Sequence, residues 1–432
     1  MGVVYIITFF IIPFYICYDM NMNQAFDVIV IGGGPAGMMA AGVAAERGQK
    51  VLLLEKNSNL GKKLRITGGG RCNITNNTPD TRQLLKKYGE AEQFLFSAFS
   101  QHDVEATLKF FHTLGLATKV EAENRVFPES ERAEDVAHTL EQFLKQTKVT
   151  VKTNVTVKKI LSESGQITGV RTSEGILTAK AYILATGGTS RPDTGSTGDG
   201  YTWLREIGHS VTTPTASLVP IKVKDKWVES VAGVSIQDTQ ISLYQNSEAF
   251  LKTTGKVLFT HNGLSGPGIL NISQHIGDTL THGPVEIRIN TLPTHNEEAV
   301  LEFMRALHTD HANKMIKNIL ADLVPKGLVG PILAQASILP DRLVNTITRQ
   351  ERHALIQAIR GLTLHVHRLL GLEKAIIASG GVALTEIDFK TMRSRHYPNL
   401  YIVGDLLDIN RPSGGYSLQL CWTTGFVAGS NT

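Results

Sequence analysis

Hydrophobic and polar positions form several distinct patterns along this chain, and each pattern predicts a different kind of element. Residues 26–56 begin with a β-branched run at 28–31, pass through glycines into an alanine-rich segment that ends at Gly48, and close on the apolar run 51–54. Strand, tight turn, helix and strand in this order form a βαβ unit. The opening of the chain therefore predicts a parallel sheet.

Helical periodicity returns at 81–115 and 131–146 and is followed by strand-like segments at 149–160 and 169–188. From about 210 to 290 the chain consists of short alternating segments broken by glycine and proline, which indicates an antiparallel, β-rich region.

Residues 296–360 carry long amphipathic stretches that indicate helices, and strands resume near 361. The tail has an apolar strand at 400–403, a glycine-rich loop and a helix of small residues. Both ends of the chain have an apolar strand, a glycine-rich loop and a helix of small residues, and the middle of the chain does not. We therefore predict one domain interrupted by inserts.

The first residues form a separate problem. Residues 3–18 are almost wholly apolar and uncharged, without the basic start and small-residue cleavage site of a signal peptide. Pro13 interrupts them, and they are short for a transmembrane helix. We favour an extension upstream of the natural start, since Met20 and Met22 precede a complete domain, with a membrane anchor and a signal peptide as alternatives. Residues 1–22 are expected to lie outside the fold.

Composition and charge narrow the functional classes. The 432 residues are 42% hydrophobic and 19% charged, which excludes a disordered or collagen-like chain. A net charge of +4 is small for this length, so nucleic acid is not expected as a partner. Cys17, Cys72 and Cys421 offer neither a disulfide framework nor zinc spacing, which favours a reducing, cytoplasmic compartment.

The GGGPAG sequence at 32–37 stands directly after the first strand and before a helix. Gly32 allows a tight turn, Gly34 lets backbone approach a diphosphate, and Gly37 lets the helix pack on the strand. Glu55 ends the second strand 18 residues after Gly37, where a carboxylate accepts from both hydroxyls of an unphosphorylated ribose. The segment therefore predicts dinucleotide binding.

Two later glycine sites favour a flavin dinucleotide over NAD. The ATGG sequence at 185–188 follows a β-meander, a chain return that has a role in flavoproteins but none in NAD-only dehydrogenases. Asp405 follows the strand at 400–403, where a carboxylate can bind a ribitol hydroxyl. Residues 414–418 open a helix whose N–H groups can face an electron-rich flavin O2. We predict FAD.

With these motifs the chain resembles the BaiN-like family of NAD(P)/FAD-dependent oxidoreductases, also called the aminoacetone oxidase family. The matching segments run in order across 25–430: IGGGPAG at 31–37, GKKLRITGGGRCNITN at 61–76, RVFPES at 125–130, ATGGTSRPDTGSTGDGY at 185–201, LFTHNGLSGPGIL at 258–270, ASGGVALTEID at 378–388 and GDLLDINRPSGGYSLQ at 404–419. The GGGRCN and FTHNGLSGP strings are specific to the family.

The resemblance implies an α/β fold: a Rossmann-like, glutathione-reductase-type FAD-binding domain split in sequence, with a β-rich insert and an all-helical insert. We expect the FAD domain at 25–208 plus 365–432, the β-rich insert at 209–295 and about 340–364, and the helical insert at 296–360. The boundary between the two inserts stays open.

The resemblance also implies a set of FAD contacts. They are Gly32, Gly34, Ala36, Gly37, Glu55, Lys56, Lys63, Arg71, Val157, Gly187, Asp405, Ser417 and Leu418. Val157 is assigned by analogy with an adenine-facing strand residue, and Val155 is its alternative. The family pattern has Glu and Asn where this chain has Asp405 and Ser417, and Asp keeps an acceptor with a shorter reach.

Several residues stay open between a chemical and a structural role. Arg71 is either a donor to phosphate or the flavin edge, or one side of a loop-fixing salt bridge. Cys72 has no second cysteine nearby, which favours a small buried thiol over a disulfide relay. His261 is either a general base or a loop-orienting residue, and Tyr416 either lines the flavin or packs beside it.

Motifs that are missing from the sequence limit the chemistry further. His365 and His367 have no carboxylate in ligand spacing, so no metal is expected. GxSxG and HExxH are absent, which leaves a hydrolase without support. No second GxGxxG occurs at 210–400, so NAD(P)H, as a transient electron donor, would bind without its own Rossmann domain. Lys62 and Lys63 are expected to meet phosphate or solvent.

We therefore predict an FAD-dependent oxidoreductase that exchanges a hydride between flavin N5 and a small organic substrate or NAD(P)H. Its substrate pocket is expected where the β-rich insert covers the isoalloxazine, near Arg71, His261 and Tyr416. The alternatives are an FAD-containing RNA-modification or nucleic-acid-associated protein and a non-catalytic flavin-binding protein. The family is linked both to aminoacetone oxidation and to reduction of steroid-like enones, so the substrate stays open, as do the catalytic residues and the oligomeric state.

Overall fold

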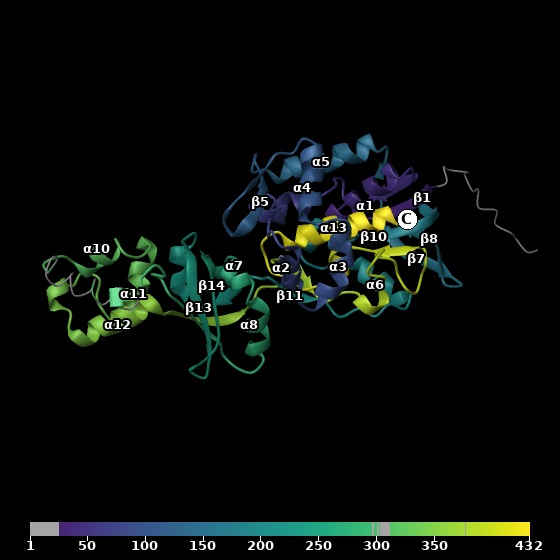
Figure 1. Cartoon of the computed structure of the whole chain (residues 1–432). Coiled ribbons are helices and arrows are strands. Elements are labelled where there is room, and N and C mark those ends of the chain that lie inside the picture. Colours follow the sequence, from purple (N-terminus) through teal and green to yellow (C-terminus); the bar gives the residue numbers. More distant parts are fainter. Residues whose placement is uncertain (1–25, 296–297, 300–301, 303–311, 376) are drawn as a thin grey trace, which may run out of the picture.

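The computed structural model describes residues 26–295, 298–299, 302, 312–375 and 377–432. Residues 1–22, predicted to lie outside the fold, and most of the amphipathic stretch at 297–308 fall outside the described residues. Figure 1 shows one domain built from both ends of the chain and a second region that projects away from it.

A five-stranded parallel sheet of order β19-β10-β1-β2-β6 forms the centre of the first domain. The central strand β1 (Phe26–Ile31) lies between β10 (Ala179–Leu184) and β2 (Val51–Leu54), with β19 (Leu400–Ile402) and β6 (Thr150–Lys152) at the two edges. The predicted α/β class and Rossmann-like fold are confirmed. The carboxyl ends of strands from distant parts of the chain therefore meet at one edge of the sheet.

Two helices of small residues pack closely against each other, and one of them, α1, packs on this sheet. A Cβ on Gly425 of α13 (Tyr416–Ser430) would lie 2.5 Å from the carbonyl oxygen of Ala36 in α1 (Pro35–Glu46). Glycine at this crossing lets the two helix backbones touch, which brings the start of α13 to the edge where α1 begins. The other helices of the domain are α2 (Thr81–Leu85), α3 (Glu92–Gln101), α4 (Val104–Thr113), α5 (Ala133–Gln146) and α6 (Asp199–Glu206).

The strand-like segment at 149–160 divides between two sheets. Its first part is β6, and its second part begins an antiparallel meander of β7 (Val157–Glu163), β8 (Gln166–Thr172) and β9 (Gly175–Leu177). Asn154, with φ at +59°, breaks the extended chain between them. A further small antiparallel sheet joins β3 (Thr75–Asn76), β4 (Thr118–Val120) and β5 (Arg125–Pro128).

The second region is a closed antiparallel barrel of order β12-β15-β14-β13-β16-β17. Alternation along its strands turns residues such as Ile241, Phe259 and Leu364 inward, where they are fully buried. The barrel strands are β12 (Ile221–Val223), β13 (Ser235–Gln245), β14 (Glu248–Thr260), β15 (Gly263–Ser265), β16 (Glu286–Ile289) and β17 (Leu362–Leu369). Its apolar core forms a cluster separate from that of the first domain.

Helices α10 (Ile316–Leu320), α11 (Val329–Gln335) and α12 (Arg349–Arg360) lie at the far end of the barrel (Figure 1). Two more, α7 (Pro267–Leu270) and α8 (Ser273–Leu280), follow β15. Thr348 and Glu351 form a capping box at the start of α12, so part of the segment expected to be β-rich at 340–364 is helical. Strand β17 continues past the predicted limit at 365 and pairs with β12 to close the barrel.

The insert enters and leaves through one narrow ribbon. Strand β11 (Thr215–Ser217) leads into it, and β18 (Ile377–Ser379) leads out and pairs antiparallel with β11. Leu218, Leu270 and Ile377 form a small apolar cluster beside the ribbon. Within the described ranges, no helix combines the length and hydropathy that a membrane span requires.

Candidate functional site

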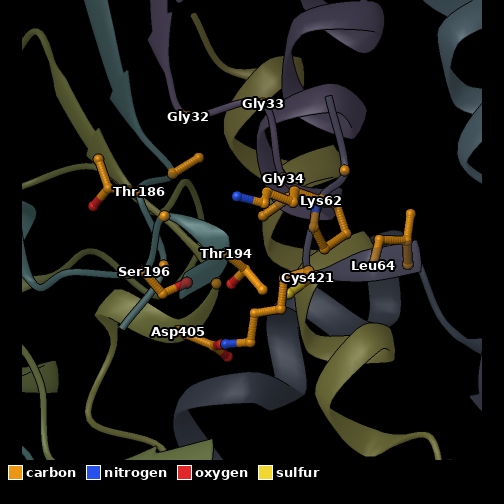
Figure 2. A pocket seen from close by; sticks show the side chains of 18 of the residues that line it. Gly32, Gly33, Gly34, Lys62, Leu64, Thr186, Thr194, Ser196, Asp405 and Cys421 are labelled. Carbon is orange, nitrogen blue, oxygen red and sulfur yellow. The ribbon is translucent and has the colours of Figure 1, made fainter. Parts of the chain in front are cut away.

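A cavity lies at the carboxyl edge of the parallel sheet, where the loops after β1, β2, β10 and β19 come together with the start of α13. Figure 2 shows the turn at 32–34 on one side of it and Asp405 with Cys421 on the other. This edge is the usual ligand site of open α/β sheets. The predicted contacts that line it are Gly32, Gly34, Ala36, Glu55, Lys63, Gly187, Asp405, Ser417 and Leu418.

The glycine turn after β1 is shaped for a ligand as well as for the fold. A Cβ on Gly32 would lie 2.5 Å from the carbonyl oxygen of Ala185, and one on Gly37 would lie 1.9 Å from that of Gly32. Gly37 therefore packs α1 and does not line the cavity. Gly34 has nothing within 4 Å of its Cβ position and begins α1 without a side-chain cap. The open space and the uncapped amides at this helix end fit a diphosphate.

Glu55 is held at the end of β2 by its neighbours. Its Oε2 accepts from the Gly33 N–H at 2.8 Å, and its Oε1 accepts from the backbone N–H and side-chain amide of Asn57 at 2.8 and 2.7 Å. The carboxylate is buried, and its oxygens keep further lone pairs for a ligand. This arrangement fits ribose hydroxyls.

A neighbouring cavity shares Gly32 and Glu55 with the first and places three further predicted residues. Lys56, Val157 and its alternative Val155 all line it. It continues along the sheet edge on the β2 side, which is where the adenine end of a dinucleotide is expected.

A cluster of three charges borders the opposite end of the main cavity, with Lys63 and Asp405 partly exposed and Arg411 buried. Lys63 Nζ donates to Ser190 Oγ at 2.7 Å and lies 3.3 Å from Asp405 Oδ2, while Arg411 Nη2 donates to Asp405 Oδ1. Burial would raise the pKa of Asp405, but Arg411 and Lys63 outweigh it and hold that pKa below its usual value. Two cations beside one anion leave a net positive charge, which fits an anionic ligand.

Thr186 adds a polar group that the described residues do not satisfy. Its buried hydroxyl has no hydrogen-bond partner among them, and the residue lines both cavities. The hydroxyl faces the backbone of Gly200 in α6, where a Cβ would lie 2.3 Å from it, and does not point into the open space (Figure 2). The features that make the site fit FAD are therefore the uncapped end of α1, the carboxylate of Glu55 and the cationic cluster.

The structure does not place Arg71 at the cavity. Its guanidinium pairs with Glu121 at 2.5 Å and Glu131 at 3.1 Å and lies over the ring of Phe127 at 4.1 Å. Two carboxylates and an aromatic face occupy the side chain, so the loop-fixing salt bridge is the role seen here.

The other open residues also take structural positions. Cys72 is fully buried, and burial raises the pKa of its thiol to about 12, as expected of an inert packing residue. Tyr416 is buried beside Tyr88, whose hydroxyl donates to the Tyr416 carbonyl at 2.9 Å, and His261 is exposed between β14 and β15. In the described part of the chain, no residue of a barrel strand lines the cavity, so the insert does not cover it as predicted.

Histidines occur in two polar clusters away from the cavity. His365 on β17 bonds to Asp225, a carboxylate that spacing along the sequence did not reveal. In the described residues, the potential ligand atoms of His209, Glu386 and His396 lie within 4.8 Å of one another. Its Nδ1 already bonds to Glu386 at 2.8 Å and its Nε2 to Ser394 at 3.0 Å, so the cluster is explained by its own hydrogen bonds.

The sequence interpretation missed Arg411. This residue stands inside the DINRPSGGYS segment, between two predicted contacts, and its side chain is 1% exposed. The available signal was that Arg411 is a charged residue in an otherwise buried tail. A charged residue is rarely buried without a partner, so a partner for Arg411 could have been expected.

Known proteins match this chain over almost its whole length. A family profile described as "HI0933-like protein Rossmann domain" matches residues 26–431. A 3-dehydro-bile acid delta(4,6)-reductase of Clostridium scindens is 32% identical over 93% of this chain and 97% of its own. A ribosomal RNA dihydrouridine synthase of Escherichia coli is 29% identical over 94% of this chain and 97% of its own.

Solved structures agree on the fold. A 3-ketosteroid delta1-dehydrogenase from Sterolibacterium denitrificans superimposes with a TM-score of 0.55 at 14% identity, covering 94% of this chain and 98% of that one. The FrdA subunit of E. coli quinol fumarate reductase gives a TM-score of 0.53 at 15% identity, covering 94% of this chain and 69% of that one.

Proposed function

The chain belongs to the HI0933-like Rossmann family of FAD-dependent oxidoreductases, and from this premise we propose that it reduces a carbon–carbon double bond conjugated to a carbonyl group. The observation that carries the proposal is the shared chemistry of two full-length relatives. One is named for a delta(4,6)-reduction of a 3-dehydro bile acid and the other for making dihydrouridine. Both names describe the addition of two hydrogens across a double bond that is conjugated to a carbonyl.

The residues around the cavity suit such a reduction. FAD, when bound, supplies the hydride. Lys63 and Arg411 leave a net positive charge at the α13 end of the cavity, and the start of that helix adds the positive end of its dipole. This potential stabilises negative charge on the ligand that the cavity holds. Apolar residues such as Val403 and Leu418 exclude water from the same space.

For the substrate class we favour a uridine in RNA, because of the outer face of the barrel. Lys222 on β12 stands opposite Arg368 on β17, and the next outward positions are Lys224 and His365. Within the described residues, Lys222, Lys224 and Arg368 take part in no ion pair. Unpaired cations on adjacent strands favour a polyanion.

The expectation that nucleic acid is not a partner rested on the net charge, which averages over all faces of the molecule. The strands that carry these cations lead directly into the ribbon: Leu370 N–H donates to Pro220 O, and Leu372 O accepts from Arg191 N–H. Arg191 in turn precedes Thr194 and Ser196, which line the cavity. An RNA bound on the barrel would therefore lie near the site. An RNA substrate also supports a cytoplasmic location.

The test offers the purified flavoprotein two substrates under anaerobic conditions with NADH or NADPH. One is unmodified ribosomal RNA and the other a 3-oxo-4,6-diene bile acid, and mass spectrometry measures the gain of two hydrogens. We expect the gain in a uridine of the RNA. Reduction of the bile acid alone overturns the choice of substrate class, and no gain in either substrate overturns the proposed reaction.

A charge-reversal variant sharpens the test. Lys222→Glu with Lys224→Glu should weaken reaction with RNA and flatten its salt dependence, while reduction of the flavin by NAD(P)H stays unchanged. Lys252→Glu with Lys256→Glu, both on β14, makes the same change of net charge, so it is the matched control and should behave like the wild type. Equal loss in both proteins contradicts a specific RNA face.

A further inference from the structure

Arg411 is the most completely buried cation described at the site, and each of its ends is occupied. Nε donates to Ser417 Oγ at 3.1 Å, Nη1 donates to Ile409 O at 2.6 Å, and Nη2 donates to Asp405 Oδ1. The side chain is 1% exposed. Arginine keeps its proton at any ordinary pH, so this position holds a permanent charge.

A buried ion pair costs desolvation energy and is weak evidence for a purely stabilising role. Here the pair is also not neutral, because Asp405 faces Lys63 as well as Arg411. The cluster therefore carries one positive charge in excess, at the wall of a cavity. Both Asp405 and Ser417, which Arg411 holds, line that cavity.

The order of the strands indicates which part of the cofactor meets this charge. Glu55 follows β2, the glycine turn follows β1, Gly187 follows β10 and Asp405 follows β19, and these strands are neighbours in that order. An elongated dinucleotide with its ribose at Glu55 and its diphosphate at α1 continues toward β19 and α13. The parts that remain are the ribitol chain, which a carboxylate such as Asp405 can bind, and the redox-active ring attached to it.

We propose that Arg411 is a positioning residue that raises the reduction potential of the bound flavin. It fixes Asp405 and Ser417 at the cavity wall and supplies the excess positive charge there. A reduced flavin is richer in electrons than an oxidised one, so a nearby positive charge binds the reduced form more tightly. The proposal rests on FAD binding and not on the substrate suggested above.

Three variants separate the charge from the hydrogen bonds. Arg411→Gln removes the excess charge, and we expect reduced FAD to lose at least about tenfold in affinity relative to oxidised FAD, which lowers the two-electron potential by about 30 mV. Arg411→Lys keeps the charge and should leave the potential near the wild type while FAD dissociates faster. The double variant Asp405→Asn with Arg411→Gln restores one excess charge through Lys63 and should recover most of the potential.

Potentials are measured by anaerobic dye equilibration, and FAD content and circular dichroism check that each variant is folded. Arg132→Gln, at a side chain 68% exposed, is the control for loss of an arginine and should change nothing. A folded, FAD-bound Arg411→Gln protein with an unchanged potential overturns the proposal. A Lys variant that shifts as far as the Gln variant overturns it as well, because charge would then not be the cause.

Discussion

The cofactor cavity and the barrel both depend on glycine, but for opposite reasons. Gly263 in β15 is close to its own protein: a Cβ there would lie 2.0 Å from the carbonyl oxygen of Ile221. Gly34 at the start of α1 has no protein atom within 4 Å of its Cβ position. In the barrel a missing side chain lets two strands touch, whereas in the cavity it keeps space that the protein itself leaves open.

This difference separates two kinds of constraint. The barrel and the cofactor domain have separate apolar cores, so damage to one need not reach the other. Substitution of a glycine required for packing should lower the stability of the fold. Substitution of a glycine required for a ligand should weaken only the binding of that ligand. Four changes test this separation.

The largest effect is expected from Gly263→Ala. The new methyl group overlaps backbone in β12, and overpacking of this kind costs about 3 kcal/mol of unfolding free energy. Calorimetry should show a lower melting temperature for the insert, with FAD content per protein unchanged. Loss of FAD together with the insert would show that the two cores unfold as one unit.

Gly34→Ala should leave the apoprotein as stable as before and weaken FAD binding roughly a hundredfold, or about 2.7 kcal/mol. The methyl group fills the space through which backbone approaches the diphosphate. Titration of apoprotein with FAD, followed by flavin fluorescence, measures the affinity. Equal affinity for the variant would place the cofactor elsewhere.

Acid should act first on the cofactor domain through His102. Burial lowers the pKa of this histidine to about 4, so between pH 6.5 and 4.5 the unfolded chain takes up a proton that the folded domain does not. Stability is therefore lost as pH falls, by roughly 2 kcal/mol over that window. Phe426 stacks on the ring at 4.4 Å, and His102→Gln should flatten the pH dependence of that domain alone. An unchanged slope would assign the acid sensitivity to other groups.

The smallest effect is a gain. Gly330 in α11 also has nothing within 4 Å of its Cβ position, but it lies in the insert, away from the cavity. Gly330→Ala should stabilise the insert by about 0.5–1 kcal/mol, because alanine favours a helix more than glycine does. FAD affinity, measured alongside Gly34→Ala, should not change; a decrease would break the distinction between the two open glycines.

Local chemistry could be predicted from the sequence. The turn at 32–37 and the acid at Glu55 lie within one βαβ unit, so their spacing alone fixes where they meet a ligand. The structure places both at the cavity. The β-rich character of the insert could be predicted, but the closed barrel could not. The pair that closes the barrel, β12 with β17, joins segments well over a hundred residues apart in the sequence.

Two arginines show why side-chain partners are harder to predict. Arg71 stands after three glycines in a predicted cofactor motif, but its partners Glu121 and Glu131 are 50 and 60 residues away. Arg411 is only six residues from Asp405, yet what makes it important is its burial against Ser417 at the start of α13. Burial depends on the assembled fold, and no local pattern records it.

The ribbon of β11 and β18 has a practical consequence for protein engineering. Because the chain departs at Ser217 and returns at Ile377 on paired strands, the intervening region can be exchanged as a cassette when its few bonds to the first domain, such as that of Asn271 with Ser413, are kept. Chimeras that graft the barrel of one relative onto the dinucleotide-binding half of another would show which half dictates the choice of substrate.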